Sequence, residues 1–250
     1  MLELESFYPE VGSIIQFKRE ELAGAEADDA LSVCEELIAA YRLGAAGALL
    51  IEYDAQTFRQ ALAQSGLVRI QMLGIEGATA ANAARYQKAT RSRALFDSLS
   101  SGHLSIAGSI VGATLRAWRP QSEYEEDYLY VQILHDVLIG AAQADGLRML
   151  DRFEAILNGT PCARLAVCRS LLCADQETFD EGFESLIREW AEHLVGQERS
   201  ASRNEVEFCA DRHIFFEGLA ILALAQHLGL HSEAEYRFCP SEARIALTAD

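Results

Sequence analysis

His213 and Glu217 are four residues apart, a spacing that could support chemistry because such residues share one face of a helix. An imidazole and a carboxylate placed in this way could bind a metal ion or exchange a proton with a substrate. The same two side chains could equally form a hydrogen bond near the start of a helix, and we favour this interpretation. A small-molecule enzyme with a site near His213 and Glu217 therefore stays open as an alternative.

No other group of residues has a spacing that predicts catalysis or metal binding. Cys162, Cys168 and Cys173 fall in one predicted helix, in which the first and last are about 16 Å apart at 1.5 Å per residue, too far for one zinc ion. Several serines lie near His103 without a fixed acidic partner. Glycine-rich phosphate loops and the HExxH, GxSxG and paired CxxC motifs are absent. We therefore expect no catalytic residue, no metal and no cofactor.

The charge of the chain predicts the kind of partner that it binds. The formal net charge is −17, and residues 121–200 carry 16 acidic and 6 basic residues. Such a surface repels phosphates, so we expect no direct binding of nucleic acid or anionic lipid, whereas basic proteins would be attracted. The sequence shows no secretory signal, and its most apolar run, 214–225, is short and contains Glu217. These features predict a soluble cytoplasmic protein.

The segment 175–193 predicts a helix with two distinct faces. Phenylalanine, leucine, isoleucine and tryptophan side chains recur with helical spacing on one face, which should pack on a core. The opposite face carries Glu177, Asp180, Glu181 and Glu184, and like charges at this spacing repel one another. This face is either a solvated surface of an acidic protein or a docking surface for a basic partner.

A second acidic group follows Pro120. On a helix, Glu123, Glu126, Asp127 and Tyr130 would share one face. Tyrosine beside carboxylates is typical of protein-binding surfaces, although acidic residues also favour the first turn of a helix because of its dipole. We include these four residues in the predicted partner-binding site.

The hydrophobic pattern predicts an all-α fold that forms a single helical domain. Residues 1–118 form its less clearly patterned helical part, and residues 119–250 form the helical-hairpin part. We expect residues 1–10 to be irregular, and we expect helices at 28–43, 55–64, 78–93, 92–99, 104–118, 122–144, 146–157, 162–173, 175–195 and 212–228. A loose 30-residue recurrence from Ala144 to Ala174 suggests stacked antiparallel hairpins, as in tetratricopeptide-like arrays or bundles, around a buried C-terminal helix.

Glycines and aspartates supply the expected boundaries of these helices. Gly44 and Gly66 should end two helices of the N-terminal half. In both copies of the recurrence an aspartate, Asp145 or Asp175, is placed to cap the following helix. Gly108 and Gly112, one turn apart, should pack closely against a neighbouring element.

The C-terminal two-thirds resembles immunity protein family 49 of bacterial polymorphic toxin systems. The resemblance covers roughly residues 94–240 and is a diffuse helical pattern. It comprises Asp175-x3-Phe179-x3-Phe183-x2-Leu186-x3-Trp190-x2-His193, the apolar helix 215–228, Gly229-Leu230 and Tyr236-x3-Pro240. It implies an all-helical cytoplasmic protein without catalytic residues that binds and blocks a cognate toxin domain. A basic toxin, for example a nuclease with a cationic substrate groove, would suit carboxylates that mimic phosphate. A helical-repeat scaffold that binds a peptide or protein is a further alternative.

Overall fold

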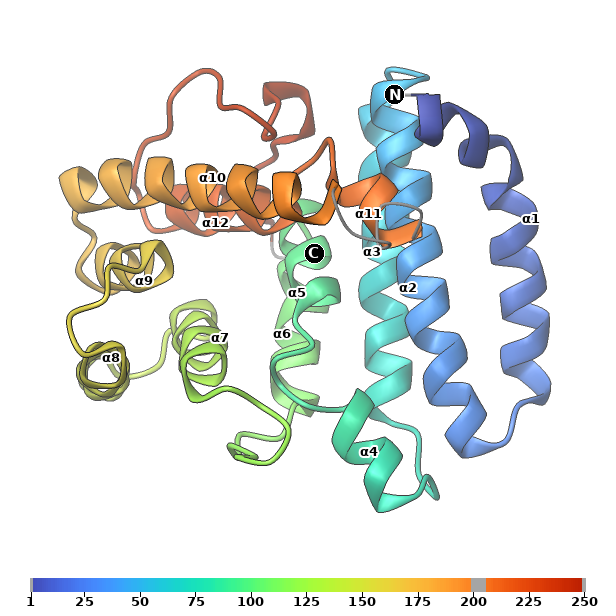
Figure 1. Ribbon diagram of the computed structural model, residues 1–250, viewed down its shortest axis with the longest axis horizontal. Coiled ribbons are helices and arrows are strands. Elements are labelled where there is room, and N and C mark those ends of the chain that lie inside the picture. The colour runs from blue at the N-terminus through green and yellow to red at the C-terminus, as the bar shows by residue number, and fades with distance from the viewer. Residues whose placement is uncertain (1, 199–205, 249–250) are drawn as a thin grey trace.

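The computed structural model describes residues 2–198 and 206–248, and within them it contains only helices, turns and two isolated β-bridges (Figure 1). The prediction of an all-α fold is therefore confirmed. The elements are α1 (Leu2–Gly24), α2 (Ala27–Leu50), α3 (Ala55–Leu73), α4 (Ala80–Tyr86), α5 (Arg93–Ser100), α6 (Leu104–Ala113), α7 (Glu125–Leu138), α8 (Gln143–Leu157), α9 (Ala163–Cys173), α10 (Gln176–Glu198), α11 (Val206–Asp211), α12 (Phe216–His227) and the 3-10 turn η2 (Ser241–Ala243).

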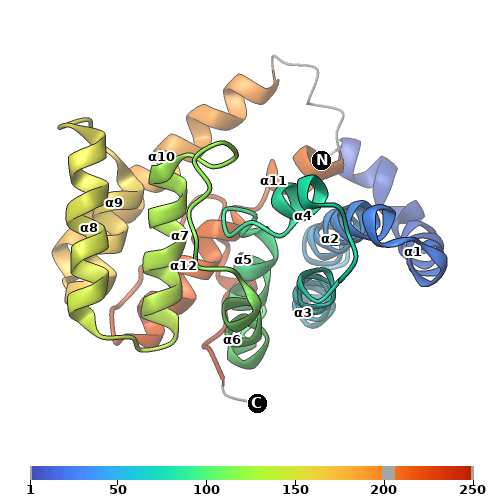
Figure 2. The same cartoon turned by 90° about the horizontal axis from the view of Figure 1, so that it is seen from below.

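Helices α1 to α3 lie side by side on one side of the molecule, and α7 to α10 lie on the other (Figures 1 and 2). Between the two groups lie α5, α6 and α12. None of the helices in the described part of the chain combines the length and the apolar character that crossing a membrane requires.

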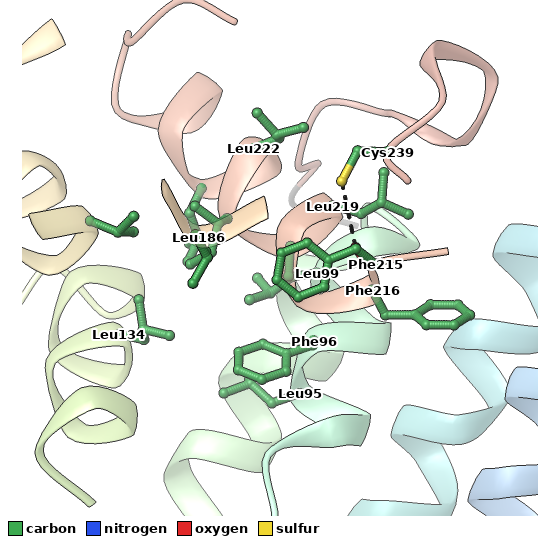
Figure 3. Packing of buried hydrophobic residues seen from close by; sticks show 14 of the residues in the cluster. Leu95, Phe96, Leu99, Leu134, Leu186, Phe215, Phe216, Leu219, Leu222 and Cys239 are labelled. Carbon is green, nitrogen blue, oxygen red and sulfur yellow. Dashed lines mark hydrogen bonds between the residues drawn. The ribbon is translucent and has the colours of Figure 1, made fainter. Parts of the chain in front are cut away.

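Helix α12 is the centre of this arrangement, as the sequence predicted for a buried C-terminal helix. Phe216 and all residues from 218 to 225 are buried, because residues 218–225 carry no polar side chain on any side of the helix. Phe215 and Phe216 meet Leu95, Phe96 and Leu99 of α5 in one hydrophobic cluster (Figure 3). The 4.7 Å stacking of Trp190 on Phe215 joins α10 to this cluster.

The prediction that residues 1–10 are irregular is wrong, because α1 begins at Leu2 and continues through Pro9. Contacts with α2 stabilise this helix: Leu4 and Val11 are buried, and the ring of Tyr8 lies directly over Gly47. A Cβ atom at position 47 would lie 1.9 Å from Cδ2 of Tyr8. Tertiary packing therefore keeps the segment around Pro9 helical, although a proline inside a helix ordinarily predicts a break.

Two predicted helix ends are also wrong. Helix α2 continues past Gly44 to Leu50, and α3 continues past Gly66 to Leu73. A Cβ atom at Gly66 would lie 2.2 Å from Oγ of Ser98 and 2.6 Å from Cγ2 of Ile106. Gly66 therefore serves the close approach of α3 to α5 and α6 and does not end a helix.

The predicted close packing at Gly108 and Gly112 is wrong, because a Cβ atom at either position would meet nothing within 4 Å.

The prediction that an aspartate caps each of two helices is correct for one aspartate only. Asp175 accepts a hydrogen bond from the backbone N–H of Thr178 at 3.2 Å, at the start of α10. Asp145 lies inside the first turn of α8 and forms an ion pair with Arg148.

Helices α7 to α10 pack on one another in chain order. Their lengths differ, since α9 has 11 residues and α10 has 23. The tetratricopeptide-like regularity of these hairpins stays a prediction.

A buried polar network connects α2 and α3 to the central helices α5 and α12 and to α11. Asp97 of α5, which is fully buried, pairs with Arg42 of α2 at 3.1 Å and accepts a hydrogen bond from Ser65 of α3 at 2.5 Å. Arg42 also pairs with Asp211 of α11 at 3.2 Å, and its guanidinium lies 4.2 Å from the ring centroid of Phe216. Burial raises the pKa of Asp97 to about 6, and the nearby Arg42 charge only partly opposes this shift.

Candidate functional site

Helix α10 is held in place by its apolar face. Phe179, Phe183 and Leu186 are buried, and Phe183 meets the ring of Tyr236 edge-on at 4.8 Å. This face is the one that the sequence assigned to the core. The opposite face must consequently point away from the core.

Glu177, Asp180, Glu181 and Glu184 are all exposed on that opposite face. Within the described residues, none of the four forms an ion pair, and Asp180 accepts a hydrogen bond from Gln176 at 2.8 Å. Their charges are therefore available to a partner. We call these four residues the acidic face.

A groove runs beside the acidic face, between α9 and α10. Its first pocket has a volume of about 410 Å³. Helix α10 contributes Thr178, Glu181, Gly182, Ser185, Arg188, Glu189 and Glu192, and the opposite wall is formed by Pro161, Cys162, Ala163 and Ala166. The two helices approach closely at Gly182, where a Cβ atom would lie 3.2 Å from the backbone nitrogen of Val167.

A second pocket, of about 350 Å³, shares Cys162 and Glu189 with the first. Its remaining lining consists of Arg164, Leu186, Trp190, His193, Phe215 and Glu217. Leu186 and the stacked rings of Trp190 and Phe215 supply its apolar part. The indole N–H of Trp190 is buried and donates no hydrogen bond to any residue that the structure describes.

The charged wall of the second pocket is a network around Arg164. The guanidinium donates to both oxygens of Glu217 at 2.9 Å and to Asp127 at 3.0 Å. Tyr130 donates its hydroxyl to Glu217 at 2.8 Å, and the guanidinium lies 4.8 Å from the Tyr130 ring centroid. Burial and the Glu217 charge raise the pKa of Tyr130 well above its usual value. Burial opposes the charge on Arg164, but Glu217, Tyr130 and Asp127 together outweigh burial and raise the arginine pKa.

Arg164 was not among the residues predicted from the sequence. Its partner Glu217 lies 53 positions away, and no local periodicity marks a pair so far apart. The only local signal was the presence of an arginine in the first turn of a largely apolar helix.

The second predicted acidic group does not form one outward face, and this expectation is wrong. Glu123 is buried, and its carboxylate accepts hydrogen bonds from Thr90 and from the backbone N–H of Arg119. Tyr130 is 1% exposed. Asp127 is half-buried and pairs with Arg164, and Glu126 is also half-buried. Because α7 begins at Glu125, after a loop, Glu123 has no helical register with the other three residues.

The structure does not bring His213 and Glu217 onto one helical face. Helix α12 begins at Phe216, so His213 lies in the turn before it, while Glu217 accepts hydrogen bonds from Arg164 and Tyr130. Among the residues that the structure describes, no three histidine, cysteine or acidic side chains gather as a metal site would require. Cys168 is buried, Cys162 half-buried and Cys173 exposed.

Comparison of the chain with family models, with curated proteins and with solved structures finds no match. The resemblance to immunity protein family 49 therefore stays a prediction.

Proposed function

We propose that this protein binds a basic protein through the acidic face of α10 and blocks that protein without catalysis, as an immunity protein blocks its toxin. The observation that carries this proposal is the exposure of Glu177, Asp180, Glu181 and Glu184 without an ion pair in the described part of the chain. Unpaired like charges repel one another on a helix, so this arrangement costs stability. A cationic partner relieves that repulsion and is steered to the site.

Two further observations support the proposal. The net charge of −17 favours association with basic proteins over nucleic acids. The buried apolar face of α10 fixes the helix on the core, so the acidic face is presented on a rigid element, which lowers the entropic cost of binding. We place the protein in the cytoplasm of a bacterium, and we take the partner to be a toxin domain with a cationic surface, such as a nuclease.

The test is a rescue assay with the toxin domain encoded beside the gene for this protein. Coexpression should protect cells, and the quadruple charge reversal of the acidic face (Glu177, Asp180, Glu181 and Glu184 to Lys) should abolish protection. The purified variant should bind the toxin at least about tenfold more weakly, equivalent to 1.4 kcal/mol, and with a smaller salt dependence.

The matched control reverses four exposed glutamates on the opposite side of the molecule, Glu10, Glu20, Glu26 and Glu76. This variant has the same net charge as the first. Equal affinities of the two variants would show that only total charge matters, and unchanged binding by the α10 variant would refute the proposal.

A further inference from the structure

The α9–α10 groove holds a carboxylate that is fixed in position and not neutralised. The backbone N–H of Ala163 donates to one oxygen of Glu189 at 3.1 Å, which holds the carboxylate at the junction of the two pockets. Its second oxygen has no hydrogen bond within the described residues. Glu192 lies one turn further along α10, is exposed and lines the first pocket. The two carboxylates therefore face the same space.

The cations near these carboxylates do not satisfy them. Among the described residues that line the second pocket, Arg164 and His193 are the basic ones. All three guanidinium nitrogens of Arg164 already contact Glu217 or Asp127. Among the described residues, Arg188 is the one basic residue that lines the first pocket, and it forms no ion pair with any of them. The groove thus retains net negative charge beside an apolar wall.

That combination suits one kind of side chain. The stem of a long basic residue can pack on Trp190 and Leu186 while its charged head reaches Glu189. A guanidinium is planar, carries five N–H donors and is weakly hydrated, so it can bridge two carboxylates beside aromatic rings, whereas an ammonium is a compact and strongly hydrated charge. Arginine is also among the residues that contribute most to binding at protein interfaces.

We propose that the α9–α10 groove receives an arginine side chain of the protein partner, with Glu189 and Glu192 binding the guanidinium and the wall around Trp190 packing on the stem. This inference rests on the proposed function and adds to it the residue that anchors the partner. The acidic face steers the partner, and the groove recognises it.

The test uses a hexa-arginine peptide and the fluorescence of Trp190. The chain has two tryptophans, so Trp118→Phe leaves Trp190 as the only indole reporter. Titration should give a saturable change in emission. In this background, Glu189→Gln with Glu192→Gln should weaken binding roughly tenfold, whereas Glu177→Gln with Glu184→Gln, the same charge change on the same helix, should weaken it less than about twofold. Glutamine keeps the oxygen that accepts from Ala163, so thermal melting should show that both variants fold.

A hexa-lysine peptide should bind roughly fivefold more weakly than hexa-arginine. Equal loss of affinity in the two double variants, or equal affinity for the two peptides, would overturn the inference. If the groove fails this test while reversal of the acidic face still abolishes protection from the toxin, the proposed function stands without the arginine anchor. If that reversal leaves protection intact, the proposed function fails whatever the peptide does.

Discussion

Asp97 is a fully buried carboxylate whose charge opposes folding, and replacing it by asparagine should change how stability depends on pH. Burial raises the pKa of Asp97 from 3.8 to about 6 in the folded protein. In the unfolded chain an aspartate titrates near pH 3.9. Between these two pKa values the folded protein keeps a proton that the unfolded chain releases, so the contribution of Asp97 to stability falls as the pH rises through this window.

The size of this effect follows from the shift. Two pKa units at 1.36 kcal/mol each give about 3 kcal/mol, and integration over the titration curves places about 2 kcal/mol of this between pH 4 and pH 7. Asp97→Asn removes the titration, while the asparagine oxygen can still accept from Ser65, and Arg42 keeps its ion pair with Asp211. The unfolding free energy of the variant minus that of the wild type should therefore increase by about 2 kcal/mol from pH 4 to pH 7.

Urea unfolding of both proteins at half-unit pH steps measures this difference. Groups that titrate alike in the two proteins contribute equally to both unfolding free energies, so their contributions cancel in the difference. Asp151→Asn, at an exposed position on α8, is the control, and its profile should run parallel to that of the wild type. A profile of Asp97→Asn that also runs parallel to the wild type would refute the reasoning. A difference that shrinks as the pH rises would do so too, since it would mean that the pair with Arg42 lowers the pKa more than burial raises it.

Two further predictions concern packing and the charged wall of the groove. Gly66→Ala should lower the unfolding free energy by about 1–2 kcal/mol, because overpacking against Ser98 and Ile106 outweighs the gain in helix propensity. Gly108→Ala has free space around the added Cβ atom and should raise the unfolding free energy by about 0.5–1 kcal/mol in the same urea experiment. The opposite order would contradict the close approach of α3. Arg164→Met should cost about 1–2 kcal/mol, less than the loss of a fully buried pair because about a third of the arginine is exposed. Arg169 pairs with the exposed Glu154, so Arg169→Met should cost less than about 0.5 kcal/mol. Equal costs of the two substitutions would show that loss of the Arg164 partner does not destabilise the protein through Glu217.

Helices α10 and α12 could be predicted from the sequence because their signals are local. Helix α10 has a capping aspartate, an apolar stripe and an acidic face within one continuous segment, and α12 is apolar on all sides from residue 218 to residue 225. Such patterns determine which face is buried irrespective of the rest of the chain.

The N-terminal half was harder to predict because tertiary contacts override the local signals there. Pro9, Gly44 and Gly66 would ordinarily interrupt helices, yet each lies inside one. Close contacts such as Tyr8 on Gly47 stabilise these helices, and the sequence does not reveal which residues meet. For the same reason, only part of the candidate site could be predicted from the sequence. The acidic face follows from periodicity, whereas the groove depends on Arg164 and Glu217, which meet only in the folded protein.

The position of α12 in the chain has a consequence for how the protein is made. A ribosome releases more than 200 residues before residues 216–227 emerge, and until then the apolar surfaces of α5 and α10 that pack on this helix are uncovered. A chain that stops short of α12 would present those surfaces to proteases and chaperones and would not persist as a partly active fragment. On the function proposed above, the dose of toxin that a cell tolerates would therefore follow from the number of chains in which α12 has been made.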